Sequence, residues 1–247
     1  MNEDRSRTVN TLGLLPHEAF GAFVLPPLDP ATVEGFEALG DLTGMTSDAM
    51  DELGIKGVIP ASILRPTDPG ARLVGRALTV LNKARPEAIE AAVASGVSKL
   101  ADVEAHHLAE PGDVLVLQGV DMVSNMGGIL ATIAQRQGEI GAIVDGAVRD
   151  IDHSRGIGYP IWSRSVSPIT GKWRVQTIAV NVAVTICGII VTPGDLVVAD
   201  EVGVCIVPRA RAQEVLVRAQ RISSREADRR AAIGDGASIA DVMSRPR

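Results

Sequence analysis

Apolar positions along the chain follow two spacings, one typical of buried strands and one typical of helices. Short apolar runs over residues 71–82, 111–119 and 141–146 predict strands. Between the last two runs, residues 127–138 have helical spacing and end at Gly138, a residue common at helix C-termini. A strand, a helix and a strand in this order predict a parallel pair joined by a right-handed crossover.

Helices are also expected on either side of this unit. Three of them are predicted over about residues 29–39, over 86–100 and over 209–232. A fourth is expected to begin at a cap, Thr46 or Ser47, and to stop at Gly54 or Gly57. The helix over 209–232 is highly charged, and its apolar face consists of Val215, Leu216, Ala219 and Ile222.

The C-terminal half has a different pattern. Residues 177–208 predict several short strands and hardly any helix. Residues 1–30 form a proline-containing arm, of which the first eight or so residues are expected to be disordered. We therefore expect one α/β domain over residues 31–208, with a parallel strand–helix–strand core and a β-rich C-terminal half, and a helical extension over residues 209–247.

The composition limits the classes of partner. Hydrophobic residues make up 46% of the chain and aromatic residues only 2%, so the core must be aliphatic, as in parallel sheets covered by helices. Few aromatic rings and a net charge of −6 argue against nucleic acid as a partner. The most apolar stretch, residues 178–198, contains Asn181 and Pro193, and the N-terminus lacks the apolar core of a signal peptide. We therefore expect no membrane span and a cytoplasmic protein.

The two cysteines lie in apolar runs on either side of the Pro193–Asp195 turn. Cys187 and Cys205 could therefore face each other across a pair of strands. We expect them to be buried free thiols, and a disulfide or a redox role is the alternative.

The strongest chemical signal lies at the start of the predicted helix over 127–138. The first amides of a helix have no acceptor within the helix, and the helix dipole adds positive charge there, so this end can bind a carboxylate or a phosphate. Gly127 and Gly128 carry no side chains that would block a ligand. Glycines needed only for the turn are the alternative interpretation.

The strand over 141–146 leads to Arg149 and Asp150. Ligand sites of parallel sheets lie at the carboxyl ends of the strands, so both side chains and the amides near Gly128 are expected in one crevice. The guanidinium of Arg149 suits a carboxylate, and the carboxylate of Asp150 suits Mg²⁺, which needs few protein ligands. A surface ion pair between the two residues is the alternative.

Several other side chains are weaker candidates. His106 and His107 have no spacing typical of a metal site, and we expect them to pack at the surface or at a helix end. His153 could reach the same crevice as Asp150. The loop over 172–174, with Lys, Trp and Arg, could cover the site or bind a distal carboxylate of the substrate.

The segment GGILATIAQRQGEIGAIVDGAVRD, residues 127–150, resembles the signature of the RraA-like family. Four further segments resemble other motifs of that family: TSDAMDELGIKG, ARLVGRALTV, PGDVLVLQG and TPGDLVVADEVGVCIVP. The family contains 4-hydroxy-4-methyl-2-oxoglutarate aldolases, oxaloacetate decarboxylases and the regulator of ribonuclease E activity. An older name for some members is demethylmenaquinone methyltransferase, but the chain has no glycine-rich nucleoside loop followed by an acidic residue.

The resemblance implies a β/β/α swivelling-domain fold and a homotrimer or homohexamer with sites at subunit boundaries. It implies that Arg149 binds the carboxylate and oxo group of a small 2-oxo acid, and that Asp150 binds Mg²⁺ or a similar metal such as Mn²⁺. It assigns the carboxylate-binding amides to Gly128, Ile129 and Leu130, next to Gly127. Asp200 or Glu201 lies near an acidic position that the family places at the neighbouring subunit's site.

One position departs from the aldolase pattern. Aldolases of the family carry an acid twenty-one positions before the arginine, and this chain has Gly128 there. A retro-aldol step needs a base, whereas metal-assisted decarboxylation needs only an electron sink, so the departure favours a decarboxylase. Asp121 or Asp145 could replace the acid. We therefore expect a Mg²⁺-dependent carbon–carbon lyase that yields pyruvate, and the alternative is a non-catalytic regulator of the ribonuclease E inhibitor type.

Overall fold

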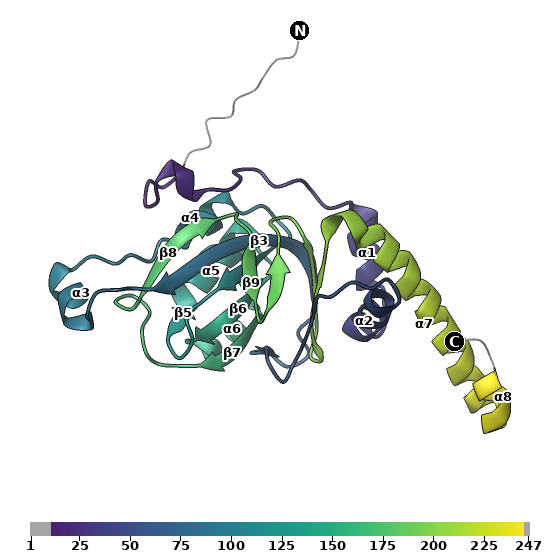
Figure 1. The fold of residues 1–247 in the computed structure, drawn as a ribbon. Helices are drawn as coiled ribbons and strands as arrows, with labels where there is room; N and C mark the ends of the chain where they lie inside the picture. Colours follow the sequence, from purple (N-terminus) through teal and green to yellow (C-terminus); the bar gives the residue numbers. More distant parts are fainter. Residues whose placement is uncertain (1–10, 245–247) are drawn as a thin grey trace, which may run out of the picture.

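The computed structural model describes residues 11–244, which form a mixed β-sheet with helices against one face and a β-hairpin against the other (Figure 1). The strands are β1 (Val58–Pro60), β2 (Arg65–Pro66), β3 (Leu73–Ala84), β4 (Asp113–Gln118), β5 (Ser124–Met126), β6 (Gly141–Val148), β7 (Ile161–Val166), β8 (Val175–Val180), β9 (Val184–Ile186), β10 (Ile189–Val191), β11 (Leu196–Ala199) and β12 (Gly203–Val207). The helices are α1 (Pro30–Glu37), α2 (Leu42–Glu52), α3 (Ile89–Ser95), α4 (Val103–Leu108), α5 (Gly128–Gln137), α6 (Ile151–Gly156), α7 (Ala212–Gly234) and α8 (Ile239–Ser244). Short 3-10 turns lie at His17–Ala19 and Arg209–Arg211.

The centre of the sheet is parallel, as the sequence pattern predicts. The order is β1-β12-β11-β3-β4-β6-β7-β2, and β3, β4, β6 and β7 run parallel to one another. Helix α5 connects β5 to β6 and ends at Gly138, which has φ +92°. The strands of the C-terminal half, β8, β11 and β12, add to the sheet in antiparallel fashion, and β9 and β10 form a separate hairpin. The α/β class and the parallel core are confirmed.

Apolar residues fill three clusters around the sheet. One lies beneath α4 and α5 and includes Val144, Val148 and Ala131. A second packs α1, α2 and α7 against β11 and β12, and the third lies between the other sheet face and the β9–β10 hairpin. In the first cluster the even-numbered residues of β6 face α5, because successive side chains of a strand point to opposite faces.

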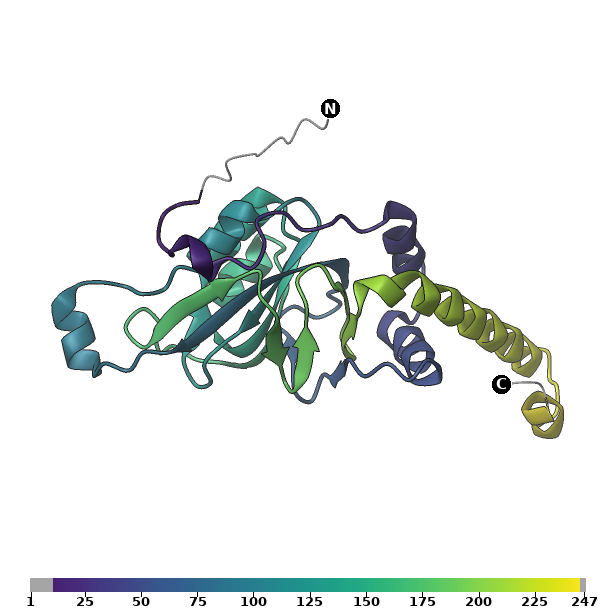
Figure 2. The ribbon, with the colours of Figure 1, turned by 45° about the horizontal axis from the view of Figure 1, so that its top comes forward.

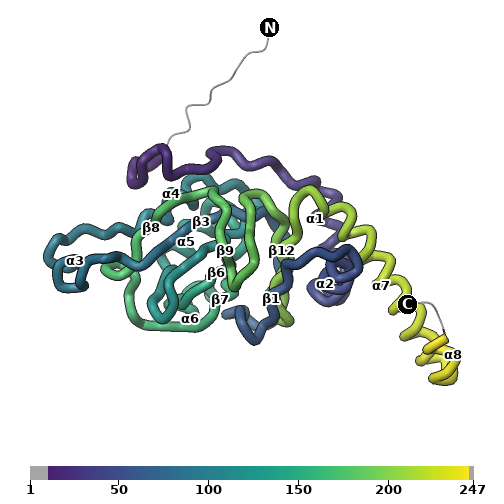
Figure 3. The backbone as a smooth tube through the Cα atoms, in the orientation of Figure 1, coloured from purple at the N-terminus to yellow at the C-terminus, as the bar shows by residue number. Residues whose placement is uncertain are grey.

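The N-terminal arm is docked over the body from residue 11 onwards (Figure 3). Glu104, which is fully buried, accepts hydrogen bonds from the amides of Leu12 at 2.8 Å and Leu14 at 2.7 Å. Arg76 donates to the carbonyl of Leu25 at 2.9 Å, and Phe20 is buried in the first cluster. The disorder predicted for the first eight residues lies outside the described residues.

Two helix predictions need correction. Helix α2 begins at Leu42, and its cap is Asp41, whose carboxylate accepts from the amide of Gly44 at 3.2 Å. Thr46 lies inside the helix, where its hydroxyl donates to the carbonyl of Leu42, so neither Thr46 nor Ser47 is the cap. The helix expected over 86–100 is limited to α3, because only Ala92 of its apolar side is buried in this chain.

Helix α7 confirms the predicted C-terminal helix and extends away from the sheet, with α8 folded back at its end (Figure 2). Val215, Leu216 and Ala219 are buried against α1 and α2, and Ile222 packs at their edge. No helix within residues 11–244 is long and apolar enough to cross a bilayer.

The cysteines do not face each other. Cys205 lies buried in β12 opposite Val198, whereas Cys187 lies at the β9–β10 turn, half-buried, with φ +49°. Both are free thiols, as expected, but only Cys205 is also buried. Burial, and to a smaller extent the negative charge of Asp145, raises the pKa of Cys187 to about 12. The thiol is therefore not a nucleophile at neutral pH.

Candidate functional site

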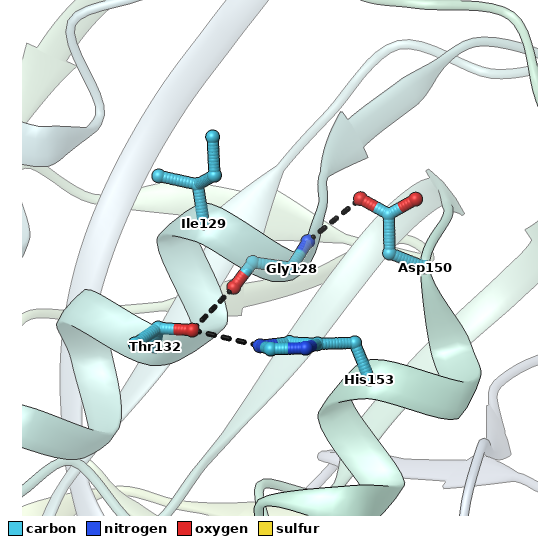
Figure 4. Close-up of a pocket in the computed structure, with 5 residues that line it drawn as sticks. All are labelled: Gly128, Ile129, Thr132, Asp150 and His153. Carbon is cyan, nitrogen blue, oxygen red and sulfur yellow. Dashed lines mark hydrogen bonds between the residues drawn. The ribbon is translucent and has the colours of Figure 1, made fainter.

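The start of α5 forms one wall of a pocket. The first hydrogen bond within the helix runs from the amide of Ala131 to the carbonyl of Gly127, at 3.1 Å, so the three preceding amides have no acceptor in the helix. The pocket has a volume of about 470 Å³ and is lined by Gly128, Ile129, Thr132, Asp150 and His153 (Figure 4). Its lining therefore comes from the N-terminal turn of α5 and the residues that follow β6.

Asp150 faces the helix start. It lies two residues after the end of β6 and has φ +56°, a left-handed conformation that aspartate tolerates better than most residues. Its Oδ2 accepts a hydrogen bond from the amide of Gly128 at 2.9 Å. The amides of Ile129 and Leu130 remain without an acceptor in the helix, so they are the ones that could bind an anionic ligand.

Arg149 lies next to this carboxylate. Its Nε is 3.6 Å from Oδ2 of Asp150, and the two side chains are 44% and 47% exposed. An ion pair this exposed contributes at most about 1 kcal/mol, so either group can change partner when a ligand binds. The structure thus places Arg149 and Asp150 together at the start of α5, as the sequence pattern predicts, although Arg149 does not itself line the pocket.

Both glycines at the helix start are needed for this close approach. A Cβ at residue 127 would lie 2.8 Å from Oδ2 of Asp150 and 3.2 Å from Nε of Arg149. A Cβ at residue 128 would lie 3.0 Å from Cδ2 of His153. The glycines therefore do more than form a turn, because they allow three polar side chains to pack against the backbone of the helix.

Thr132 and His153 form the remaining polar wall. The hydroxyl of Thr132 donates to the carbonyl of Gly128 at 2.8 Å, and the same oxygen lies 2.8 Å from Nε2 of His153. His153 thus lines the same pocket as Asp150, which its position in the sequence allowed. Thr132 was missed, although its place four residues after Gly128 puts both on the same side of the helix.

A divalent cation fits this site only if a few protein ligands suffice. Within residues 11–244 no three His, Cys, Asp or Glu side chains come together to hold a metal. Asp150 offers Oδ1, while Oδ2 is held by the amide of Gly128. One hard carboxylate oxygen with bound water and substrate is an arrangement that Mg²⁺ accepts, whereas zinc sites need three or four protein ligands. The residues present therefore fit Mg²⁺ or Mn²⁺.

Neither acid suggested as a substitute for the missing one lines the pocket. Asp145 forms an ion pair with Arg164 and accepts from the amide of Cys187, and Asp121 accepts from the amide of Met122. Both are committed to local structure. The prediction that one of them supplies the base has no support in the geometry.

The other candidates also lie elsewhere. Lys172 stacks over the ring of Trp173, 4.5 Å from its centroid, in the turn before β8, and neither residue lines the pocket. Asp200 accepts from the amide and hydroxyl of Thr43 and is largely buried, whereas Glu201 accepts from the amide of Gly70.

His106 packs in the last turn of α4, as one of the two expectations had it, and is fully buried there and not at the surface. Its Nδ1 lies 2.6 Å from Oε1 of Glu139, whose other oxygen accepts from the hydroxyl of Tyr159 at 3.1 Å. Burial would lower the pKa of His106, but Glu139 raises it above its ordinary value. Burial raises the pKa of Asp102, one helical turn away, to about 6. No spacing in the sequence indicates this cluster, since its members come from separate elements.

Comparisons with known proteins agree with this architecture. A family model described as RraA-like, Aldolase/RraA, matches residues 43–206. A protein of Halalkalibacterium halodurans, provisionally named a 4-hydroxy-4-methyl-2-oxoglutarate aldolase, is 32% identical over 78% of this chain and 85% of its own length.

Two solved structures share the fold. An uncharacterized protein of Pseudomonas syringae has a TM-score of 0.74 and 30% identity, and the match covers 88% of this chain and 99% of that one. Streptomyces coelicolor RraAS2, described as an unusual member of the RNase ES inhibitor RraA protein family, has a TM-score of 0.69 and 28% identity, over 84% of this chain and 99% of its own. The resemblance inferred from the motifs is therefore confirmed, and the chain belongs to the RraA-like family.

Proposed function

We propose that this protein is a magnesium-dependent carbon–carbon lyase that acts on a small 2-oxo acid. The observation that carries the proposal is the convergence of three groups at the start of α5, beside the pocket. These groups are the guanidinium of Arg149, the carboxylate of Asp150 and the helix amides of Ile129 and Leu130, which have no acceptor within the helix. The guanidinium and the two amides are hydrogen-bond donors that suit a carboxylate with an adjacent oxo group. The carboxylate of Asp150 suits the metal ion that would bind the same substrate oxygens.

Each group has a defined task in this proposal. The amides of Ile129 and Leu130 bind the substrate carboxylate, and Arg149 donates to the carboxylate and the oxo oxygen. Asp150 would hold Mg²⁺, which supplies Lewis-acid stabilisation when it is bound. Arg149 would also stabilise the negative charge that develops on the oxo oxygen as the carbon–carbon bond breaks, because its guanidinium carries a permanent positive charge.

Decarboxylation and retro-aldol cleavage leave the same negative charge on the product, which is protonated to pyruvate. The relative from H. halodurans is provisionally named an aldolase, which supports the retro-aldol reaction. The absence of an acid at Gly128 supports decarboxylation of a β-keto acid such as oxaloacetate. Both reactions use the binding groups described above, so the proposed site does not depend on the choice.

A non-catalytic regulator is the second candidate. The similarity to RraAS2 supports it. The pairing of Asp150 with a helix amide and Arg149 in an open pocket favours an enzyme, because a protein that only binds a partner has no need for this arrangement.

Incubation of the purified protein with oxaloacetate and with 4-hydroxy-2-oxo acids tests the proposal. Pyruvate should be released in the presence of Mg²⁺ and not in excess EDTA, as measured by a coupled lactate dehydrogenase assay. Uncatalysed decarboxylation by Mg²⁺ alone is the blank. Release at the blank rate for every substrate would contradict the lyase and leave the regulator.

A further inference from the structure

Helix α4 and the residue before it carry three titratable side chains that are buried beneath the N-terminal arm. Asp102 precedes the helix and is 2% exposed, and Glu104 and His106 within it are fully buried. Glu104 holds the arm, because its carboxylate accepts from the amides of Leu12 at 2.8 Å and Leu14 at 2.7 Å. The docking of residues 11–15 therefore depends on the conformation of the first turn of α4.

The charges around Asp102 do not balance when its carboxyl group is ionised. His106 pairs with Glu139, and this contact uses Nδ1 of the imidazole, at 2.6 Å from Oε1. Oδ2 of Asp102 has no hydrogen-bond partner among residues 11–244. A buried carboxylate without enough donors or a cation of its own favours its neutral form. Burial accordingly raises the pKa of Asp102 to about 6, and the charge of His106 offsets only part of this effect.

The other charged and titratable groups around the cluster leave Asp102 without a cation of its own in the part of the chain that the structure describes. Some are paired with one another and the rest are exposed: Arg76 with Glu110 and Asp113, Lys99 with Glu87, Tyr159 with Glu139, and the exposed His17, Glu18 and His107. Of these groups, His17 belongs to the arm itself and lies against Phe23. Its titration is the alternative source of a pH response in the arm.

We propose that Asp102 is a proton-dependent latch for the N-terminal arm, which docks more firmly when Asp102 is protonated. Helix α4 has only six residues, so its first turn can open without the sheet. Opening gives an ionised Asp102 access to water, and it also withdraws Glu104 from the amides of Leu12 and Leu14. Ionisation of Asp102 therefore favours release of residues 11–15.

The rest of the arm has anchors of its own. The amide of Gly21 donates to the carbonyl of Val180 at 3.0 Å, and the side-chain amide of Asn181 donates to the carbonyl of Ala22 at 2.9 Å. Phe20 is buried in the first apolar cluster. Residues 11–15 can thus detach while residues 20–25 remain on the body.

The direction and size of the response follow from the two ionisation states. Docking is firmest at low pH, where Asp102 is protonated in both the docked and the released arm, and this contribution is lost as the pH rises through about 6. The difference between 3.8 and about 6 corresponds to at most about a 100-fold change in the opening equilibrium.

Hydrogen exchange of the full-length protein between about pH 4 and about pH 8 tests the latch. Exchange at the amides of Leu12 and Leu14 is followed by mass spectrometry with fragmentation and corrected for the intrinsic rate. In the wild-type protein, the opening constant of these amides should increase by up to about 100-fold over this range. The amides of β11 and β12 report global unfolding in the same samples, and they should remain better protected than the arm.

Three variants assign the response to its source. Asp102→Asn should remove the pH dependence of arm opening. Glu104→Gln loses one of the two acceptors for the arm, so it should raise the opening constant at every pH and keep the slope. His17→Asn is the control, since it removes the titratable group of the arm and should leave the slope unchanged.

Four results overturn the inference. These are a pH-independent opening of the arm amides in the wild-type protein, a slope that persists in Asp102→Asn, a slope that disappears in His17→Asn, and equal protection of the arm and of β11 and β12. The last result would mean that the arm opens only when the whole protein unfolds. If Asp102→Asn does not fold, the profiles of the wild-type protein and of His17→Asn decide between Asp102 and His17.

Discussion

Replacement of Asp150 separates its role in the fold from its role in the proposed chemistry. Asp150 has φ +56°, and its carboxylate accepts from the amide of Gly128 at 2.9 Å. Asparagine tolerates this backbone conformation and keeps one oxygen for the amide of Gly128, whereas alanine does neither. Asp150→Asn is therefore the cleaner variant, since it removes the negative charge and little else.

The expected changes in stability follow from these contacts. The left-handed backbone costs alanine about 1 kcal/mol more than asparagine, and the lost hydrogen bond costs about another 1 kcal/mol. Asp150→Ala should therefore unfold about 2 kcal/mol more easily than the wild-type protein. Asp150→Asn loses only the exposed contact with Arg149, which is worth less than about 1 kcal/mol.

The expected loss of activity is much larger than the loss of stability. If the carboxylate of Asp150 holds the metal, its neutralisation should remove several kcal/mol of transition-state stabilisation. The kcat/KM should then decrease by at least about 100-fold. Pyruvate release should be measured across a Mg²⁺ titration, and thermal melting should be measured on the same samples. Asp152→Asn is the matched control, because it changes the same charge on a side chain that is 95% exposed and outside the pocket.

Wild-type turnover with an unchanged Mg²⁺ response in Asp150→Asn would refute the assignment of the metal to this residue. An equal loss of activity in Asp152→Asn would refute it as well, because a general charge effect would then suffice. A loss that appears only in Asp150→Ala, together with a lower melting temperature, would assign Asp150 a structural role.

Three further predictions concern the start of α5, the buried Asp102 and the assembly. Gly128→Asp should lower the melting temperature, because its Cβ would lie 3.0 Å from the ring of His153. The double variant Gly128→Asp, His153→Ala should recover the melting temperature and catalyse retro-aldol cleavage faster than Gly128→Asp alone. Burial raises the pKa of Asp102 from 3.8 to about 6, so the wild-type protein should lose stability as the pH rises through this range, and Asp102→Asn should abolish that loss in melting curves. Light scattering should give the mass of a trimer or hexamer at micromolar concentration, and a stable monomer would contradict this.

Much of the fold follows from the spacing of apolar residues, and the errors have a physical cause. The parallel core was predictable because β4, α5 and β6 each have a clear period and a clear end, such as Gly138. Helix α3 was overestimated because Val93 and Val97 have helical spacing yet are 50% and 58% exposed. An apolar spacing predicts which side of a helix is apolar, but not that the same chain covers it.

The convergence of the site was predictable for a similar reason. Arg149 and Asp150 follow β6, and Gly128 begins the helix after β5, so the topology of a parallel sheet brings them to one edge. The bond from Gly128 to Asp150 was not predictable, because it depends on the left-handed backbone of Asp150. The packing of His153 depends in turn on the direction of α6, which that backbone sets.

The sequence and the structure lead to different interpretations of the glycine at position 128. As a departure from the aldolase pattern, it suggests a lost base and therefore a decarboxylase. In the structure it leaves the space against which the ring of His153 packs, and Nε2 of that ring lies 2.8 Å from the hydroxyl oxygen of Thr132. The site thus still has a polar side chain beside residue 128, supplied by α6 in place of α5. A missing side chain is evidence of lost chemistry only where no neighbouring element has taken its place, and here one has.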